Sequence, residues 1–145
     1  MPTYVCSTEA GRLTQAQRLR IVESLTAIHA EETGAPRYLV QVVFCDVQPH
    51  SLYVGGKPAP AGQVWIRGDI RSGRTTAVKR RMIERILHDV CTVTGVTEAE
   101  IWVYICDIPA ENIAEYGRIL PSPGDEAAWL TTLPESLRTR LVALG

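Results

Sequence analysis

The sequence feature that most constrains the fold is an internal repeat at an offset of 61 residues. At that offset, residues 2–47 align with residues 63–108 without a gap, and nine of the 46 aligned positions are identical. The longest similar run places Val42–Val47 on Val103–Ile108. A repeat of this kind indicates one supersecondary unit used twice. The alternative, coincidence between two amphipathic units, would predict the same elements without a symmetry that relates them.

Each half has the pattern of a strand, a helix and a second strand. Apolar residues recur at helical spacing in one long segment of each half, and runs rich in β-branched and aromatic residues flank it. The predicted helices span 15–33 and 76–94, and the predicted strands span 3–7, 39–47, 63–70 and 101–108. The expected caps are Thr14 and Thr75 at the helix N-termini and Gly34 and Gly95 at the C-termini. The expected core stripe of the first helix is Leu19, Val22, Leu25 and Ile28.

Two such units predict an α/β fold, arranged as a two-layer α+β sandwich. The crossover helix makes the strand pair of each half parallel, and the two pairs join into one four-stranded mixed sheet with both helices on one face. The 145 residues are expected to form a single domain, 1–145, with repeat halves 2–62 and 63–108 and a C-terminal helical segment 109–145. In that segment, short helices are expected over 109–117, around Trp129 and from Pro134. The other face of the sheet lacks a third layer, which predicts packing between subunits.

Composition and charge exclude several classes of protein. The 15 Lys and Arg against 16 Asp and Glu give a formal net charge of -1, which argues against nucleic-acid binding through phosphate neutralisation. The sequence shows neither a basic leader nor a long apolar run, so no membrane partner and a cytoplasmic location are expected. The four cysteines have no metal-binding or redox spacing, and no P-loop or dinucleotide fingerprint occurs, so neither a metal nor a cofactor is expected.

The strongest local signal for a ligand is the string Arg71-Ser-Gly-Arg74-Thr75 before the second helix. The free N–H groups of a helix N-terminus favour anions, and two added guanidiniums predict a carboxylate or phosphate clamp at Arg71 and Arg74. The alternative is a solvated loop whose arginines pair with surface acids.

Pro2 is a second signal, because the initiator Met is normally trimmed before Pro and a secondary amine then ends the chain. An α-amino group titrates near pH ~8, and burial or nearby charges can adapt it to acid or base work near neutrality. Retention of Met1 would remove this chemistry. Taken singly, His29 on the first helix, Tyr104 on the last strand and Glu115 in the C-terminal segment are typical of packing or solvated residues.

Together these residues resemble the tautomerase superfamily, and within it the cis-3-chloroacrylic acid dehalogenase group. The matching strings are Ala27-Ile-His29, Leu52-Tyr-Val-Gly-Gly56, Arg71-Ser-Gly-Arg74-Thr75, Ile101-Trp-Val-Tyr104 and Glu115-Tyr-Gly-Arg-Ile-Leu-Pro-Ser-Pro-Gly124, with Pro2 before them. The resemblance covers nearly all of residues 2–134. It implies the tautomerase fold, a homotrimer and an active site around the terminal proline.

The resemblance also implies roles for single residues. Arg71, Arg74 and His29 would bind the carboxylate of a small substrate, and Glu115 with Tyr104 would position and activate water. Water would add to C3 of an α,β-unsaturated acid while cationic Pro2 protonates C2, and a 3-halo substrate would then lose hydrogen halide to give malonate semialdehyde. Two alternatives stay open: a keto–enol tautomerase of 2-keto acids with neutral Pro2 as the base, and a non-catalytic binding protein.

Two positions depart from the pattern of the efficient dehalogenases. Ala35 stands where that group has a Thr after Thr33-Gly34, and Ile70 stands where a His precedes the first Arg. Fewer polar partners in the site predict poorer positioning of the substrate. We therefore expect weak dehalogenase activity together with promiscuous hydratase and tautomerase activity.

Overall fold

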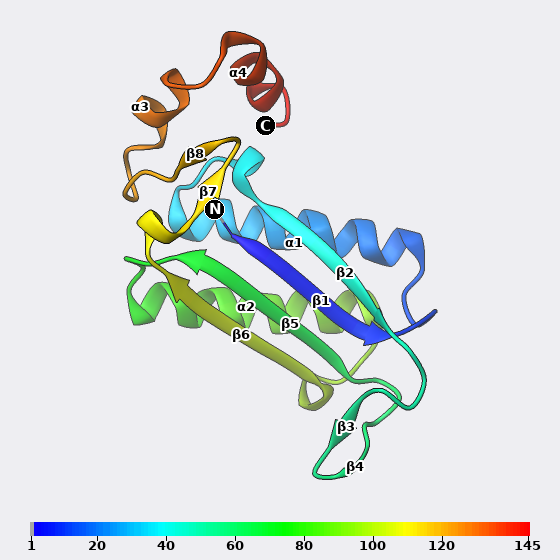
Figure 1. The fold of residues 1–145 in the computed structure, drawn as a ribbon. Helices are drawn as coiled ribbons and strands as arrows, with labels where there is room; N and C mark the ends of the chain where they lie inside the picture. The colour runs from blue at the N-terminus through cyan, green and yellow to red at the C-terminus, as the bar shows by residue number, and fades with distance from the viewer. Residues whose placement is uncertain (1) are drawn as a thin grey trace.

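The computed structural model describes residues 2–145 and has two main layers, a four-stranded sheet and two long helices (Figure 1). The elements of these layers are β1 (Thr3–Glu9), α1 (Gln15–Thr33), β2 (Gln41–Val47), β5 (Val64–Arg71), α2 (Thr76–Thr94) and β6 (Ile101–Ile108). The strand order is β2-β1-β5-β6, with a parallel pair inside each half and an antiparallel β1–β5 pair that joins the halves. Both helices lie on the same face of the sheet (Figure 1). The predicted mixed sheet with two helices on one face is confirmed.

The two long helices begin and end at the predicted residues because their caps are strong. Thr14 accepts a hydrogen bond from the Gln17 N–H, and the Gln17 side chain accepts one from the Thr14 N–H, which forms a capping box. Thr75 caps α2 through its side chain. Gly34 and Gly95 each have a φ of 72°, in the left-handed region that glycine adopts without steric cost. The helices lie 61 residues apart, at the offset of the repeat.

The core lies between the sheet and the two helices. Its buried members include Tyr4, Cys6, Ile21, Leu25, Ile28, Val64, Ile66, Met82, Ile86 and Val90. The stripe predicted for α1 is wrong at its first two positions, since Leu19 is 58% exposed and Val22 is only half-buried, whereas Ile21 is buried. A spacing of four and then three residues keeps the buried stripe on one face, whereas a constant spacing of three drifts around the helix. His29 extends the buried stripe at its C-terminal end.

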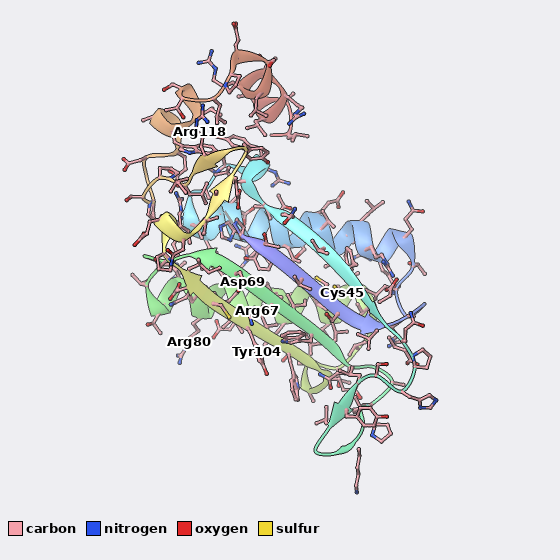
Figure 2. The ribbon with its side chains drawn as sticks, viewed as in Figure 1. Cys45, Arg67, Asp69, Arg80, Tyr104 and Arg118 are labelled. Carbon is pink, nitrogen blue, oxygen red and sulfur yellow. The ribbon has the colours of Figure 1, made fainter. Side chains whose placement is uncertain are left out.

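The opposite face of the sheet carries large side chains in the open. Val43 on β2 is 39% exposed, and Trp102 and Tyr104 on β6 are 41% and 46% exposed. Figure 2 shows Arg67 and Tyr104 on this face, in front of the sheet, with the helices behind it. An apolar sheet face of this kind is typical of an interaction surface.

Two short hairpins and two short helices complete the chain. β3 (Tyr53–Val54) pairs with β4 (Lys57–Pro58) between β2 and β5, and β7 (Ala114–Glu115) pairs with β8 (Arg118–Ile119) after β6. α3 (Glu126–Thr131) and α4 (Glu135–Val142) follow, close to the positions predicted for them. Among residues 2–145, no helix combines the length and the apolar character that a bilayer crossing requires.

The helix predicted over residues 109–117 is wrong. A single 3₁₀ turn, Ala110–Asn112, follows Pro109, and the chain then enters the β7–β8 hairpin. Tyr116 and Gly117 have positive φ values of 52° and 77°, as a type I′ turn requires. A Pro and a Gly eight residues apart fit the two ends of a helix, but they equally fit a turn followed by a hairpin. The hairpin is the element that positions Glu115.

A second, smaller core anchors the C-terminal segment. Its buried members are Leu39, Leu120, Trp129, Leu133 and Leu141. The Trp129 Nε1–H donates to the Ile119 carbonyl at 2.8 Å, and the Tyr116 hydroxyl donates to the Tyr38 carbonyl at 3.2 Å. These contacts hold the β7–β8 hairpin between α3 and the turn that precedes β2.

Candidate active site

The start of β1 and the end of β5 meet at one edge of the sheet, because these strands are antiparallel. Thr3 pairs with Asp69, which brings Pro2 beside the last residues of β5. Pro2 is buried, and its carbonyl accepts a hydrogen bond from the Gln41 N–H at 3.0 Å. Met1, whose removal the sequence predicts, lies outside the described residues. This edge therefore holds Pro2 in place between β2 and the end of β5.

His29 lies on the side of α1 that faces the sheet and is 3% exposed. Its Nδ1 lies 3.0 Å from the Tyr4 hydroxyl, and the two rings meet edge to face with centroids 5.9 Å apart. Burial lowers the pKa of His29 to about 3, and the positive charges of Arg74 and Arg71 act in the same direction. The imidazole is therefore neutral near pH ~7 and has one N–H to donate.

Arg71 ends β5 and is 4% exposed, so the alternative of a solvated loop does not hold for it. Its Nη1 donates to the Pro121 carbonyl at 2.6 Å, and its Nη2 forms a salt bridge with Glu126. Its Nε is buried and has no hydrogen-bond partner among residues 2–145. The C-terminal segment thus holds the guanidinium and leaves one of its nitrogens unsatisfied.

Arg74 lies in the loop between β5 and α2, next to the cap Thr75, and is half-buried. Burial and the charge of Arg71 lower the pKa of Arg74, and Glu126 opposes them. Within the part of the chain that the structure describes, Arg74 forms no salt bridge. Its positive charge is therefore available to an anionic ligand.

Glu115 approaches the same edge from β7, which lies beside the start of β1 (Figure 1). Burial raises the pKa of Glu115, and the charge of Arg71 partly offsets the rise. Its Oε2 is buried and lacks a hydrogen-bond partner among the described residues. A carboxyl in this state is suited to proton exchange closer to neutral pH than an ordinary glutamate. It lines a hollow of about 410 Å³ with Thr3, Tyr38, Val40, Gln41, Ile113, Ala114 and Tyr116.

Tyr104 lies apart from the other predicted site residues. It pairs with Arg67, which in turn pairs with Val5, so Tyr104 is two strands across and three residues along from Pro2. Strands about 4.8 Å apart, with a rise of about 3.3 Å per residue, put the two Cα atoms more than about 10 Å apart. Tyr104 stands on the open face of the sheet, edge to face with Trp65 at 5.8 Å between centroids (Figure 2). Within one chain, Tyr104 is not brought to the edge that holds Pro2.

Two residues of the site were missed by the sequence reasoning. Tyr4 alternates with Cys6 and Thr8 toward the helices, so its burial was detectable, but its contact with His29 depends on the packing of α1. Glu126 is an acid in the tail with no motif around it, and only the folded chain shows its contact with Arg71.

The assembled groups fit acid–base work on a small anion. They provide the buried Pro2, a neutral imidazole, two guanidiniums and a carboxyl of raised pKa. Among residues 2–145, no group of three or more His, Cys, Asp and Glu side chains could hold a metal ion. The site residues themselves offer a ligand N–H donors, positive charge and a proton acceptor.

Comparison with known proteins gives a family match and close structural matches. The family model described as "Putative oxalocrotonate tautomerase enzyme" matches residues 1–132. A search of curated proteins finds no match. The crystal structure of N1, a member of the cis-3-chloroacrylic acid dehalogenase (cis-CaaD) family, is 43% identical, with a TM-score of 0.93 over 97% of this chain and 99% of that one.

Two further solved structures share the fold at lower similarity. Native Ps01740 is 37% identical, with a TM-score of 0.74 over 78% of this chain and 99% of its own. The R7 fused 4-OT wild-type asymmetric trimer is 25% identical, with a TM-score of 0.72 over 81% and 94% of the two chains. With a family match over most of its length and a cis-CaaD family member at 43% identity, the chain belongs to the tautomerase superfamily and to its cis-3-chloroacrylic acid dehalogenase-like group.

Proposed function

We propose that this protein is an enzyme that adds water to small α,β-unsaturated monocarboxylates, 3-halo acids among them, with the amine of Pro2 as the acid. The observation that carries the proposal is the meeting of Pro2, His29 and Arg71 with Glu115 at one edge of the sheet. The identity to a cis-CaaD family member supports the same chemistry. Removal of Met1 frees the amine on which the reaction depends.

The substrate carboxylate would be bound by the two arginines and His29. Arg74 supplies a charge without a salt bridge among residues 2–145, and Arg71 supplies its unsatisfied Nε–H. In the tautomer in which the Tyr4 hydroxyl donates to Nδ1, the imidazole hydrogen of His29 is on Nε2 and would donate to the ligand. These donors draw electron density toward the carboxylate and make C3 a better target for water.

The two proton transfers fall to Glu115 and Pro2. Glu115 would accept a proton from water while the water oxygen bonds to C3. The Pro2 ammonium would give a proton to C2. With a 3-halo acid, the adduct carries hydroxyl and halogen on the same carbon, so loss of the hydroxyl proton and of halide forms the aldehyde of malonate semialdehyde. The raised pKa of Glu115 suits it to this exchange.

We further propose a homotrimer whose subunits meet through the open sheet faces. Val43, Trp102 and Tyr104 are exposed there. The R7 fused 4-OT structure, which is a trimer, has the same fold. Tyr104, remote from Pro2 of its own chain, would then complete the site of a neighbouring subunit and help Glu115 position water.

The two departures from the efficient dehalogenases lower the expected rate. Ala35 is 4% exposed and Ile70 is fully buried, so both positions have apolar side chains packed beside the site. Neither side chain donates a hydrogen bond to a substrate, and poorer positioning raises the barrier. We therefore propose low efficiency with cis-3-haloacrylates and promiscuous tautomerase activity.

The test is product analysis with wild type and Pro2→Ala. Incubation with cis-3-chloroacrylate should release chloride and give an aldehyde product, and Pro2→Ala, which exchanges the secondary amine held by the proline ring for a more mobile primary amine, should turn over more slowly. Intact mass establishes whether Met1 is removed in each preparation. Equal turnover by Pro2→Ala, in a sample whose wild type lacks Met1, would contradict the proposal.

A keto–enol tautomerase of 2-keto acids is the second candidate, and the family description supports it. In that reaction Pro2 must be neutral, and the positive charges of Arg71 and Arg74 favour a neutral amine. Direct titration of the Pro2 amine, with rates on phenylenolpyruvate, separates the two functions. A neutral amine near pH ~7 favours the tautomerase, and a charged one favours hydration.

A further inference from the structure

Arg71 is held by the C-terminal segment in a way that the proposed reaction does not require. Pro121 and Glu126 occupy two of its three nitrogens, and both come from the chain that follows β8. The side chains of Arg71 and Glu126 are 3% and 12% exposed, so the pair is largely shielded from water. A pair at this depth interacts more strongly than a surface salt bridge.

Glu126 is itself fixed by the backbone. Its Oε2 accepts a hydrogen bond from the Gly124 N–H at 2.9 Å, while Oε1 faces Arg71. Burial raises the pKa of Glu126, but the hydrogen bonds and charge of Arg71 and the Gly124 N–H outweigh it and lower the pKa below its ordinary value. Glu126 is therefore ionised throughout the neutral range.

Arg71, Arg74 and Glu126 form a charged cluster that an incoming anion meets, and the Pro2 ammonium and the Glu115 carboxylate of the proposed reaction carry opposite charges that cancel in the sum. Arg71 and Arg74 each carry one positive charge and Glu126 carries one negative charge, so the cluster has a net charge of +1. His29 is neutral and adds nothing to it. One carboxylate would balance this cluster, whereas a second carboxylate would remain uncompensated in a partly buried site, which is unfavourable.

We propose that Glu126 is a positioning and specificity-determining residue, which fixes Arg71 so that its Nε–H meets the substrate and which limits the site to monocarboxylates. This inference rests on the proposed function, since it assumes that the Arg71–Arg74 pair binds a carboxylate. Through Glu126, the C-terminal segment would select substrates by their charge.

The test compares two ligands that differ by one carboxylate, butyrate and succinate. Neither has a double bond to hydrate, so dissociation constants can be measured by NMR shift titration without turnover, at about pH 8, where both succinate carboxyls are ionised. Wild type should bind butyrate more tightly than succinate. Glu126→Gln, which keeps the side-chain shape, should shift the ratio of the two constants toward succinate by about tenfold, as one close charge in a partly buried site would.

Two variants serve as controls. Glu111→Gln removes one negative charge from an exposed residue near the same end of the sheet and should leave the ratio unchanged. If Glu126→Gln does not fold, Arg71→Gln is compared with Arg71→Gln/Glu126→Gln, since the loss of Glu126 should shift the ratio in the same direction in that background. Replacement of both members of a buried ion pair is commonly tolerated.

The binding experiment can fail for the role of Glu126 without contradicting the proposed hydration reaction. Equal weakening of both ligands in Glu126→Gln would mean a purely structural role and would overturn the inference, as would an unchanged ratio. A wild type that binds neither ligand would overturn the carboxylate site itself. Wild-type turnover of cis-3-chloroacrylate with an unshifted ratio would leave the proposed function standing and remove only the role of Glu126.

Discussion

Burial of His29 in the neutral state makes the stability of the fold sensitive to acid. Its folded pKa is about 3 and that of an unfolded histidine is about 6.5. Between these values the unfolded chain binds one more proton, so the contribution of His29 is fully present above pH ~6.5 and is lost as the pH falls toward 3. The free energy of unfolding should fall by up to about 1.4 kcal/mol per pH unit in this window.

Denaturant unfolding at several pH values and fixed protein concentration measures this slope. His29→Gln should reduce it, and His88→Gln, at an exposed position on α2, should keep the wild-type slope. The same slope in His29→Gln and wild type would assign the acid sensitivity to other groups.

Single residues of the site differ in how far their sequence revealed them. Arg71 and Arg74 stand out because two cations precede a helix N-terminus, and Pro2 stands out because of its place in the chain. Glu126 carries no such signal, because the partner of a buried charge is set by tertiary packing. The burial of Arg71, and therefore its difference from the half-buried Arg74, could not be predicted for the same reason.

The elements also differ in how well local sequence determined them. Both long helices have strong caps at each end, such as Thr14 and Gly34, so their bounds were predicted to the residue. Residues 109–117 carry a Pro and a Gly that fit two structures, and packing decided between them. Tyr116 has a positive φ in the turn of the hairpin. Its hydroxyl is hydrogen-bonded to the Tyr38 carbonyl, and its ring packs on Trp129 with the centroids 6.5 Å apart, so these contacts hold the turn.

The docking of α3 on the β7–β8 hairpin should control the geometry of both Arg71 and Glu115. Trp129 is 7% exposed and hydrogen-bonded to Ile119, so Trp129→Ala should cost about 3–5 kcal/mol of unfolding free energy. It should also lower the affinity for carboxylates, because Glu126 lies on the same helix. Leu144→Ala, at a position 64% exposed, is the control and should change neither.

Thermal or denaturant unfolding and ligand titration check this prediction together. A Trp129→Ala protein with reduced stability and unchanged carboxylate binding would show that α3 stabilises the fold without shaping the site.

At the scale of the whole molecule, the proposed trimer would form through the open sheet face. Val43→Asp places a charge on the open face of the edge strand β2, where burial against another subunit would be costly. Wild type is expected to sediment as a trimer of 16.0 kDa chains, and Val43→Asp as a smaller species with reduced turnover because Tyr104 no longer reaches a neighbouring site. Leu19→Asp, on the outer side of α1, should keep the wild-type assembly.

Analytical ultracentrifugation distinguishes these outcomes. A Val43→Asp protein of wild-type mass would mean that the subunits meet elsewhere, and full activity in a monomer would mean that Tyr104 is not needed.

The duplicated fold has a consequence for the number of reactive centres. At the 61-residue offset, the counterpart of Pro2 is Gln63, which follows a peptide bond and can never bear a free amine. The counterpart of His29 is Val90, in the core of α2. Ala10 and Leu13 stand at the positions that match the two arginines. Two units in one chain thus keep both scaffolds, and the amine proposed to react can stand only in the first of them. The second half can therefore supply binding groups, as Arg71 and Arg74 are proposed to do.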